Sequence, residues 1–191
     1  MFYQRPTTQV AMDLLGKRLV RVLPDGSLLS GLIVETEAYL GIRDRACHTF
    51  DNKRTPRTEP MYLEGAHAYI YLIYGMYHCF NVVTEKKDVP EAVLIRALEP
   101  DQGIEKMKKI RKTELIKNLC SGPGKLCRAL KIDRTLNAHL LLKAPLFIED
   151  VWESVKPSQI VKCPRVWVDY AGAHARWKLR FYIRGNEFVS K

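Results

Sequence analysis

The chain has 191 residues, 47% of them hydrophobic and 27% charged, a composition that excludes a mainly disordered, collagen-like or low-complexity protein. No apolar run reaches the ~18 residues that a membrane-spanning helix needs, which excludes an integral membrane protein. The formal net charge of +10 attracts polyanions, with nucleic acid as the first candidate and an anionic membrane as the second.

The first 60 residues predict a helix, a β-hairpin and a loop. Pro6-Thr7-Thr8 and the apolar residues up to Gly16 predict a short capped helix. RLVRVL, the turn Pro24-Asp25-Gly26 and LLSGLIVETEAYL predict a hairpin with a long second strand. The polar, Arg-rich stretch from Gly41 to Pro60 predicts a loop.

The middle of the chain predicts further strands and two helices. Residues 66–83 predict one long strand, or two strands bent at Gly75, and EAVLIRAL predicts another strand. The apolar spacing from Asp101 to about Leu119 predicts a surface amphipathic helix. SGPGKLCRAL predicts a Gly-rich turn that enters a short helix.

Three later segments, PLFIEDV, RVWVDY and LRFYIRG, predict strands. Strand segments outnumber helices and β-α-β alternation is absent, so we expect an α+β fold around a mostly antiparallel sheet. The length and the lack of repeats or long linkers predict a single domain over residues 1–191.

Four tyrosines, Tyr69, Tyr71, Tyr74 and Tyr77, fall close together. In a strand, Tyr69 and Tyr71 share one face, while a bend at Gly75 can push Tyr74 outward. For any one tyrosine, a place in the sheet core is the simpler interpretation. For four in a basic protein, stacking on nucleobases or a wedge inserted into a duplex is a serious alternative.

The segment VETEAY holds two acids. Strand alternation places Glu35, Glu37 and Tyr39 on one face and Val34, Thr36 and Ala38 on the other. Because carboxylates repel phosphate, an acid near nucleic acid indicates chemistry such as the activation of water. A solvated strand face is the simpler interpretation. Spacing does not distinguish Glu35 from Glu37.

Other chemistry-bearing patterns are weaker. Residues 121–125, SGPGK, lack P-loop spacing, but they can place backbone N–H groups and Lys125 against a phosphate; a plain helix start is equally consistent. The five cysteines form no C-x-x-C pair and the five histidines are scattered. They predict free, mostly buried thiols in a reducing compartment and no metal site.

Several motifs follow one another along the chain: GLIVETEAYLG (31–41), ACH (46–48), RTPRTEPM (54–61), AYIYLIYGMYHCFNVVT (68–84), VLIRALEP (93–100), SGPGKLCRAL (121–130), RVWVDYAG and LRFYIRG. In this order and spacing the chain resembles the alkyladenine (3-methyladenine) DNA glycosylases from about Gly16 to the C-terminus. The resemblance implies a curved sheet with a barrel-like core, surrounding helices and a protruding β-hairpin.

The resemblance also implies an activity. Such an enzyme flips a damaged purine (3-methyladenine, 7-methylguanine, hypoxanthine or ethenoadenine) out of duplex DNA. It then hydrolyses the N-glycosidic bond with a water activated by a glutamate and leaves an abasic site. A lyase would need an activated amine, and these motifs present none beside the glutamate, so we expect a monofunctional enzyme of base excision repair. We also expect that it needs no metal or cofactor.

The residues that match the family's motifs take these roles by resemblance: Glu37 as general base with Arg96 beside it, Tyr39, His48 and Tyr71 around the flipped base, Asn81 as the pocket-floor residue that rejects guanine, Tyr74 as the wedge in the duplex, and Arg57, Met76 and Lys125 as DNA contacts. Two positions depart from the family pattern. Cys47 stands where a small residue is expected and can change pocket width or thiol sensitivity, and His174 stands where an acid is expected.

The expected partner is double-stranded DNA that contains damaged purines, bound by a monomer, with no membrane partner. The short stretch before the first motif predicts a prokaryotic-type enzyme in the cytoplasm near the nucleoid; a eukaryotic one would be nuclear. Three alternatives stay open: a non-enzymatic minor-groove protein with an intercalating Tyr74, an RNA-binding sheet module and a different hydrolase on the same fold.

Overall fold

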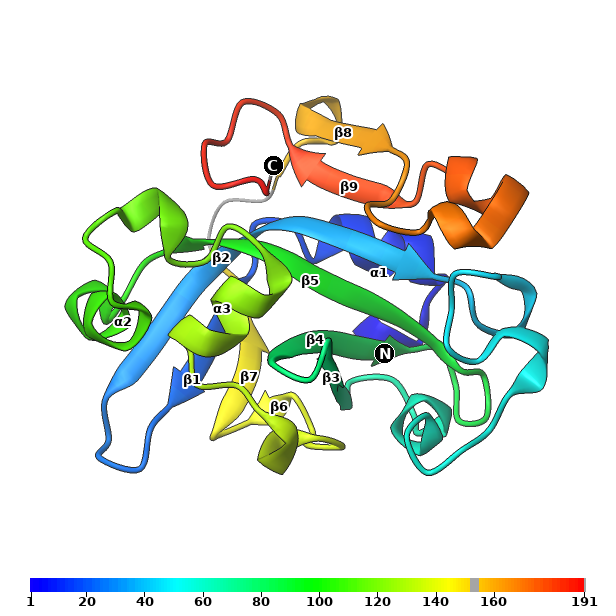
Figure 1. Cartoon of the computed structure of the whole chain (residues 1–191), viewed down its shortest axis with the longest axis horizontal. Coiled ribbons are helices and arrows are strands. Elements are labelled where there is room, and N and C mark those ends of the chain that lie inside the picture. The colour runs from blue at the N-terminus through cyan, green and yellow to red at the C-terminus, as the bar shows by residue number, and fades with distance from the viewer. Residues whose placement is uncertain (152–154, 191) are drawn as a thin grey trace.

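The computed structural model describes residues 1–151 and 155–190, and the strands in these residues form one antiparallel sheet (Figure 1). The strands are β1 (Arg18–Val22), β2 (Leu28–Tyr39), β3 (Ala68–Ile73), β4 (Tyr77–Thr84), β5 (Glu91–Pro100), β6 (Leu142–Lys143), β7 (Leu146–Glu149), β8 (Ile160–Cys163) and β9 (Arg180–Ile183). The α-helices are α1 (Thr7–Asp13), α2 (Ile104–Arg111) and α3 (Pro123–Ala129). Short 3-10 helices cover Phe2–Gln4, Gly41–Arg43, Phe50–Asn52, Glu59–Tyr62, Ile116–Asn118, Arg134–Leu136, Pro157–Gln159 and Asp169–Arg176.

The sheet curls because β2 changes its neighbour along its length. The strand order is β3-β4-β5-β2-β1-β7-β6. The first half of β2 pairs with β1, residues 35–37 pair with β9, and β5 follows nearly the whole other edge of β2. In Figure 1 the β8–β9 pair therefore lies on the opposite side of β2 from β6 and β7. The predicted α+β class with a curved antiparallel sheet is confirmed.

The β2–β5 ladder is irregular where the two acids lie, with register shifts on both sides of Glu35. Val34 packs with Phe188 outside the main core, next to Glu35. The predicted alternation is therefore wrong at Val34, because a bulge places two successive side chains on the same face. Glu35 and Glu37 do lie on one side, since both carboxylates contact Arg96.

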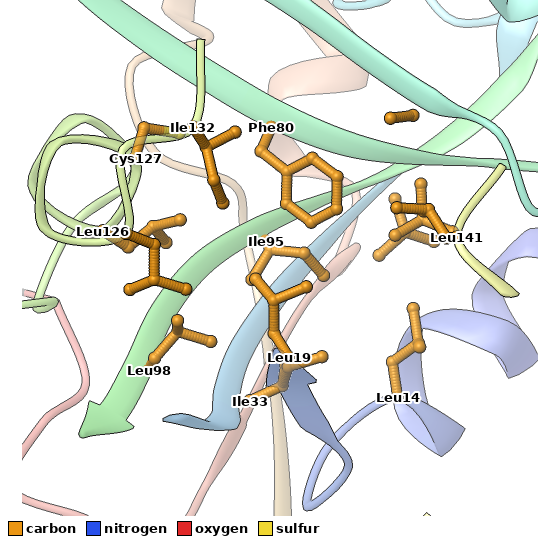
Figure 2. Close-up of a cluster of buried hydrophobic side chains, with 14 of the residues drawn as sticks. Leu14, Leu19, Ile33, Phe80, Ile95, Leu98, Leu126, Cys127, Ile132 and Leu141 are labelled. Atoms are coloured by element: carbon orange, nitrogen blue, oxygen red, sulfur yellow. The ribbon is translucent and has the colours of Figure 1, made fainter. Parts of the chain in front are cut away.

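The main core lies between the curled sheet and the helices α1 and α3. Figure 2 shows part of it: Leu14, Leu19, Ile33, Phe80, Ile95, Leu98, Leu126, Cys127, Ile132 and Leu141. The predicted first helix is confirmed as α1, whose buried Val10 and Ala11 face the sheet. Its predicted side-chain cap is wrong, because Pro6 occupies the N-cap and offers no capping group. Gly16, with φ of 83°, allows the chain to turn into β1.

The predicted amphipathic helix over residues 101–119 is only partly correct. α2 ends at Arg111, because Lys112 takes a left-handed conformation with φ of 53°. Leu115, which the periodicity assigned to the apolar face, is exposed. No helix in the described residues is both long and apolar enough to cross a bilayer.

One strand prediction is confirmed and one is wrong. Residues 66–83 form two strands, β3 and β4, and the chain reverses at Tyr74 and Gly75, so the predicted alternative with two strands that meet at Gly75 is confirmed. The segment RVWVDY is not a strand: Trp167 has φ of 60°, and a 3-10 helix begins at Asp169. The predicted strands over 91–98, 145–151 and 179–185 are confirmed as β5, β7 and β9, whereas β8 was not predicted.

Candidate active site

A pocket of about 540 Å³ gathers most of the residues that the sequence singled out. Seven of the ten predicted site residues line it: Tyr39, His48, Tyr71, Tyr74, Asn81, Arg96 and Lys125. They come from β2, the loop after it, the β3–β4 hairpin, β5 and α3. A pocket of this size holds one small organic molecule.

Glu37 lies behind the pocket wall with no exposed surface. Its Oε2 accepts a hydrogen bond from the Tyr39 hydroxyl at 2.8 Å, and its Oε1 accepts one from the backbone N–H of Val166 at 2.8 Å. Nη1 of Arg96 lies 3.3 Å from Oε1. All three partners line the pocket, so they hold this carboxylate in a fixed position at its edge.

Glu35 is equally buried but makes different contacts. Its carboxylate accepts hydrogen bonds from Nε of Arg96 at 2.9 Å and from Nε of Arg180 at 2.6 Å. Ser190 donates both its backbone N–H and its hydroxyl, at 2.7 and 2.9 Å. Of these partners in the described chain, only Arg96 lines the pocket. Glu35 thus ties the C-terminal segment to the sheet.

Arg96 of β5 bridges the two acids. Burial lowers the pKa of its guanidinium, but the carboxylates of Glu37 and Glu35 outweigh this and raise the pKa above its usual value. The arginine therefore stays a permanent cation beside Glu37, where it can stabilise negative charge on that carboxylate.

One face of the Tyr39 ring is covered by Arg165, whose guanidinium carbon lies 4.7 Å from the ring centroid. Arg165 forms a fully buried, two-pronged ion pair with Asp44. Arg165 also donates to the Ala38 carbonyl at 3.0 Å, so its guanidinium is held in place over the Tyr39 ring. Burial, then Glu37, raise the pKa of Tyr39 well above 10, which keeps its hydroxyl a donor to Glu37.

His48 and the tyrosines of β3 form an aromatic wall. Nδ1 of His48 lies 2.8 Å from the Tyr69 hydroxyl, and the rings of His48 and Tyr71 have centroids 4.6 Å apart at 74°. Burial, and then the charges of Arg57 and Lys53, lower the pKa of His48 to about 4, so this imidazole is neutral at neutral pH. Arg57 lies over the Tyr71 ring at 5.0 Å from its centroid, next to the pocket.

Asn81 is buried in β4 opposite Tyr69 and donates its side-chain amide to the Tyr69 carbonyl at 3.0 Å. Cys47 also lines the pocket, with Sγ 3.2 Å from Oγ1 of Thr49. Burial raises the pKa of this thiol, which argues against the expected thiol sensitivity because the thiolate is the reactive form. All five cysteines are free and four are buried, as predicted.

The tip of the β3–β4 hairpin is exposed and apolar. Tyr74 and Gly75 have φ of 52° and 70°, and Met76 donates its N–H to the Ile73 carbonyl, the pattern of a type I′ turn. The side chains of Tyr74 and Met76 are 78% and 66% exposed. Tyr74 borders the pocket, whereas Met76 projects from the turn beside it. This is the predicted protruding hairpin.

The start of α3 packs against this hairpin. A Cβ at Gly124 would lie 3.1 Å from Cβ of Tyr77, so glycine allows the close approach. Lys125 lies next to the pocket, with Nζ 3.3 Å from the Ser121 hydroxyl. Arg111 and Arg128 also line the pocket, so one side of its mouth is basic.

Sequence reasoning missed the segment after β8. Val166, Trp167 and Tyr170 line the pocket, and Arg165 with Asp44 supports it. RVWVDY alternates like a strand, so its pattern gave no signal of a pocket loop. His174, the other departure from the family pattern, accepts a hydrogen bond from the Arg45 N–H at 3.0 Å, outside the pocket. In residues 1–151 and 155–190, no three His, Cys, Asp or Glu side chains are grouped to hold a metal ion.

An aromatic pocket with a buried carboxylate behind its wall, in a protein of net charge +10, is typical of an enzyme that acts on a planar ring of a polyanion. The chain belongs to the methylpurine-DNA glycosylase family, whose model matches residues 1–187. It is therefore a DNA N-glycosylase of the 3-methyladenine type, and its substrate is DNA, as the sequence motifs predicted.

Three similar proteins align with the whole chain, and each is named "Putative 3-methyladenine DNA glycosylase". The one from Methanocella arvoryzae is 51% identical over 192 residues, 100% of this chain and 94% of that protein. The one from Bacillus cytotoxicus is 49% identical over 199 residues, 100% and 97% of the two chains. The one from Bdellovibrio bacteriovorus is 48% identical over 192 residues, 100% and 96% of the two chains.

Proposed function

We propose that this protein is a monofunctional glycosylase of base excision repair that removes alkylated or deaminated purines from duplex DNA. Its substrates would be 3-methyladenine, 7-methylguanine, hypoxanthine and ethenoadenine, and its product an abasic site. It would act as a monomer in the cytoplasm near the nucleoid, in keeping with its bacterial and archaeal relatives. The observation that carries the proposal is the buried carboxylate of Glu37 behind an aromatic pocket.

The pocket supports the binding of one flipped purine. Tyr39, His48 and Tyr71 present aromatic surfaces, and stacking with cation–π attraction favours an electron-poor, cationic base. His48 is neutral and adds no repelling charge of its own. Asn81, fixed by its bond to Tyr69, would disfavour undamaged guanine at its exocyclic amino group, whereas 7-methylguanine has its positive charge to favour stacking. A flipped base is the occupant because a stacked base hides its sugar C1′.

Glu37 would activate the attacking water. A carboxylate has about four acceptor sites. Tyr39 and Val166 use two and Arg96 lies beside Oε1, so Glu37 keeps acceptor capacity for a water. The water would give a proton to Glu37 as its oxygen bonds to C1′, and the electrons of the broken C1′–N bond would go to the purine. 3-Methyladenine and 7-methylguanine are already cationic in DNA and leave as neutral bases, whereas hypoxanthine and ethenoadenine are neutral and would take up a proton from solvent as they leave.

The partners of Glu37 in the described residues also support a monofunctional enzyme. They are a phenol, a backbone amide and a guanidinium, none of which is the nucleophilic amine that a lyase needs. Arg96 would stabilise the carboxylate and orient the water between protein and sugar.

The exposed hairpin supports base flipping. Tyr74 would enter the space that the extruded nucleotide leaves and offset part of the lost stacking. Met76 would contact the neighbouring bases, while Arg57 and Lys125 would bind phosphates on either side of the lesion.

The decisive experiment compares Glu37→Gln with its matched neighbour Glu35→Gln. Purified proteins are incubated in excess, with chelator, with duplexes that contain ethenoadenine, hypoxanthine or 7-methylguanine, and abasic sites are revealed by alkali. We expect Glu37→Gln to lose at least about 10³-fold in base release while it keeps lesion binding. The folded molecules of Glu35→Gln should stay active, so any loss of base release should match the fraction of the protein that is unfolded.

The reverse result, in which Glu35→Gln is folded but inactive and Glu37→Gln is active, would contradict the assignment. Lesion binding with no base release by the unchanged protein would instead favour a minor-groove protein with an intercalating Tyr74.

A further inference from the structure

Trp167 is an exposed indole on the border of the pocket. Its side chain is 78% exposed although tryptophan is among the most apolar residues, and it lines the same pocket as Glu37's partners. Its φ of 60° lies in the left-handed region, which a bulky residue rarely takes because Cβ approaches the following carbonyl oxygen. Neither burial nor backbone preference explains a tryptophan here, and strain of this kind gathers at functional sites.

The backbone on both sides of Trp167 is fixed. The preceding N–H, of Val166, donates to Glu37, and Arg165 before it is held by the buried ion pair with Asp44. Val168 after it is buried in a small apolar cluster. The indole therefore projects from a rigid segment that is directly connected to the proposed catalytic carboxylate.

Tyr170 extends this aromatic rim. It lines the pocket, is 71% exposed and donates its hydroxyl to the Ala46 carbonyl at 3.3 Å. Trp167 and Tyr170 thus give the pocket a second exposed aromatic border, which comes from a different part of the chain than the hairpin tip at Tyr74. Exposed aromatic rings on a basic DNA-acting protein have a ready partner in the faces of nucleobases.

We propose that Trp167 determines lesion affinity by lying against the extruded nucleotide at the pocket mouth and retaining it there. The assignment rests on the proposed function, because it needs a nucleotide that leaves the duplex. Stacking on an aromatic side chain changes affinity by roughly tenfold or more per base. Undamaged DNA, which keeps its bases stacked, gains nothing from this contact.

The test uses Trp167→Gly and Trp167→Phe in a Glu37→Gln background, which keeps lesion DNA intact during the measurement. Fluorescence anisotropy gives the Kd for an ethenoadenine duplex and for the same duplex without the lesion. We expect Trp167→Gly to bind the lesion duplex about tenfold more weakly and the undamaged duplex within about twofold of the parent. Trp167→Phe should restore most of the lost affinity.

Thermal unfolding separates this role from a structural one. Glycine is favoured at φ of 60°, so the Tm of Trp167→Gly should equal or exceed that of the parent. Leu115→Gly, which removes another exposed apolar side chain outside the pocket, is the matched control and should leave lesion affinity unchanged.

Base release with Glu37 intact gives a second readout. Trp167→Gly should raise the protein concentration for half-maximal release about tenfold, with a much smaller effect on the rate at saturation.

Two failures can be told apart. A parent that binds lesion and undamaged duplexes alike would overturn the proposed function and this assignment together. A parent that discriminates, with a Trp167→Gly variant that discriminates equally or loses both affinities to the same extent, would overturn the role of Trp167 alone.

Discussion

Glu35 and Glu37 differ by two positions in one strand and do different work. Glu35 is saturated by Arg96, Arg180 and Ser190, so its loss would remove the carboxylate that Arg180 contacts and leave Arg96 with Glu37 alone. Removing one partner of a buried ion pair typically costs about 3–5 kcal/mol. Glu37 instead faces partners that all line the pocket. The same residue type thus ties the C-terminal segment to the sheet at one position and lies at the edge of the pocket at the other.

Arg57 places a positive charge beside the Tyr71 side of the pocket, because its guanidinium lies over the Tyr71 ring. A cationic lesion such as 7-methylguanine must enter against this charge, whereas neutral hypoxanthine does not. Two unit charges roughly 7 Å apart interact by about 2 kcal/mol at an effective dielectric constant near 20, and by less in salt. We expect Arg57→Gln to raise the ratio of 7-methylguanine release to hypoxanthine release about fivefold.

The ratio of the two release rates within one variant is independent of any phosphate contact of Arg57, because loss of that contact slows release from both duplexes equally. Lys125→Gln, at a basic residue on the pocket border, is the control and should lower both rates without changing their ratio. An unchanged ratio in Arg57→Gln would show that this arginine leaves the pocket before the base arrives.

The β3–β4 hairpin stores strain at its tip. A type I′ turn favours Asn-Gly, but this chain has Tyr74-Gly75, with Tyr74 at φ of 52°. The left-handed conformation costs a tyrosine roughly 1–2 kcal/mol more than it costs asparagine. We therefore expect Tyr74→Asn to raise the Tm by about 2–4 °C and to weaken lesion-specific binding about tenfold.

Calorimetry and anisotropy on the same samples check both halves of this prediction. Binding to undamaged duplex should keep its affinity and its salt dependence, because those come from phosphate contacts. A variant that is more stable and binds lesions as well as the unchanged protein would remove Tyr74 from the flipping step.

At the scale of elements, the sequence predicts what local pattern controls. The strands β2, β5 and β9 follow from β-branched runs, and α1 and α3 follow from their apolar spacing and flanking glycines. The helix over 101–119 fails because the periodicity continues past Lys112, whose backbone conformation breaks it. RVWVDY fails because alternation cannot reveal that Trp167 adopts a positive φ under tertiary constraint.

For the candidate site too, the sequence predicts what local motifs carry and misses what long-range contacts create. The motif match supplies the residues that line the pocket, from Tyr39 to Lys125. It does not supply the Arg165–Asp44 ion pair or the engagement of Glu35 by Ser190, because these join positions more than 120 residues apart. Long-range ion pairs leave no periodic trace in a sequence. Spacing alone leaves Glu35 and Glu37 equivalent, and it is the motif match that selects Glu37.

At the scale of the whole molecule, the net charge of +10 supplies general attraction to DNA, and the proposed selection of damaged bases belongs to the pocket. Basic residues gather at the pocket mouth, where Arg111, Lys125 and Arg128 meet, while the pocket wall itself is aromatic and holds a neutral histidine. His48 itself adds no charge to this wall, although Arg57 lies beside it over the Tyr71 ring, and the low pKa of His48 makes the stability of the fold sensitive to acid.

The stability of the whole protein should depend on His48 in a defined pH range. Its pKa is about 4 in the folded protein and about 6.5 in the unfolded chain. Between these values the unfolded chain takes up a proton that the folded protein refuses. The stabilisation by neutral His48 is therefore complete above about pH 6.5 and is lost as pH falls toward 4. From this residue alone, the free energy of unfolding should fall by roughly 2 kcal/mol between about pH 7 and pH 5.

Urea unfolding at these two pH values measures the effect, with His48→Gln as the test variant, since glutamine keeps a polar partner for the Tyr69 hydroxyl but does not titrate. We expect His48→Gln to lose less stability than the unchanged protein over this range, by about the same 2 kcal/mol. Asp44 contributes with the same sign but at lower pH: Arg165 overcomes the effect of burial and lowers the pKa of Asp44 below its usual value, so its stabilisation is lost only under more acidic conditions. Equal pH dependence in His48→Gln and the unchanged protein would mean that His48 is not held neutral, and a charged imidazole would then repel the cationic bases that the pocket is proposed to bind.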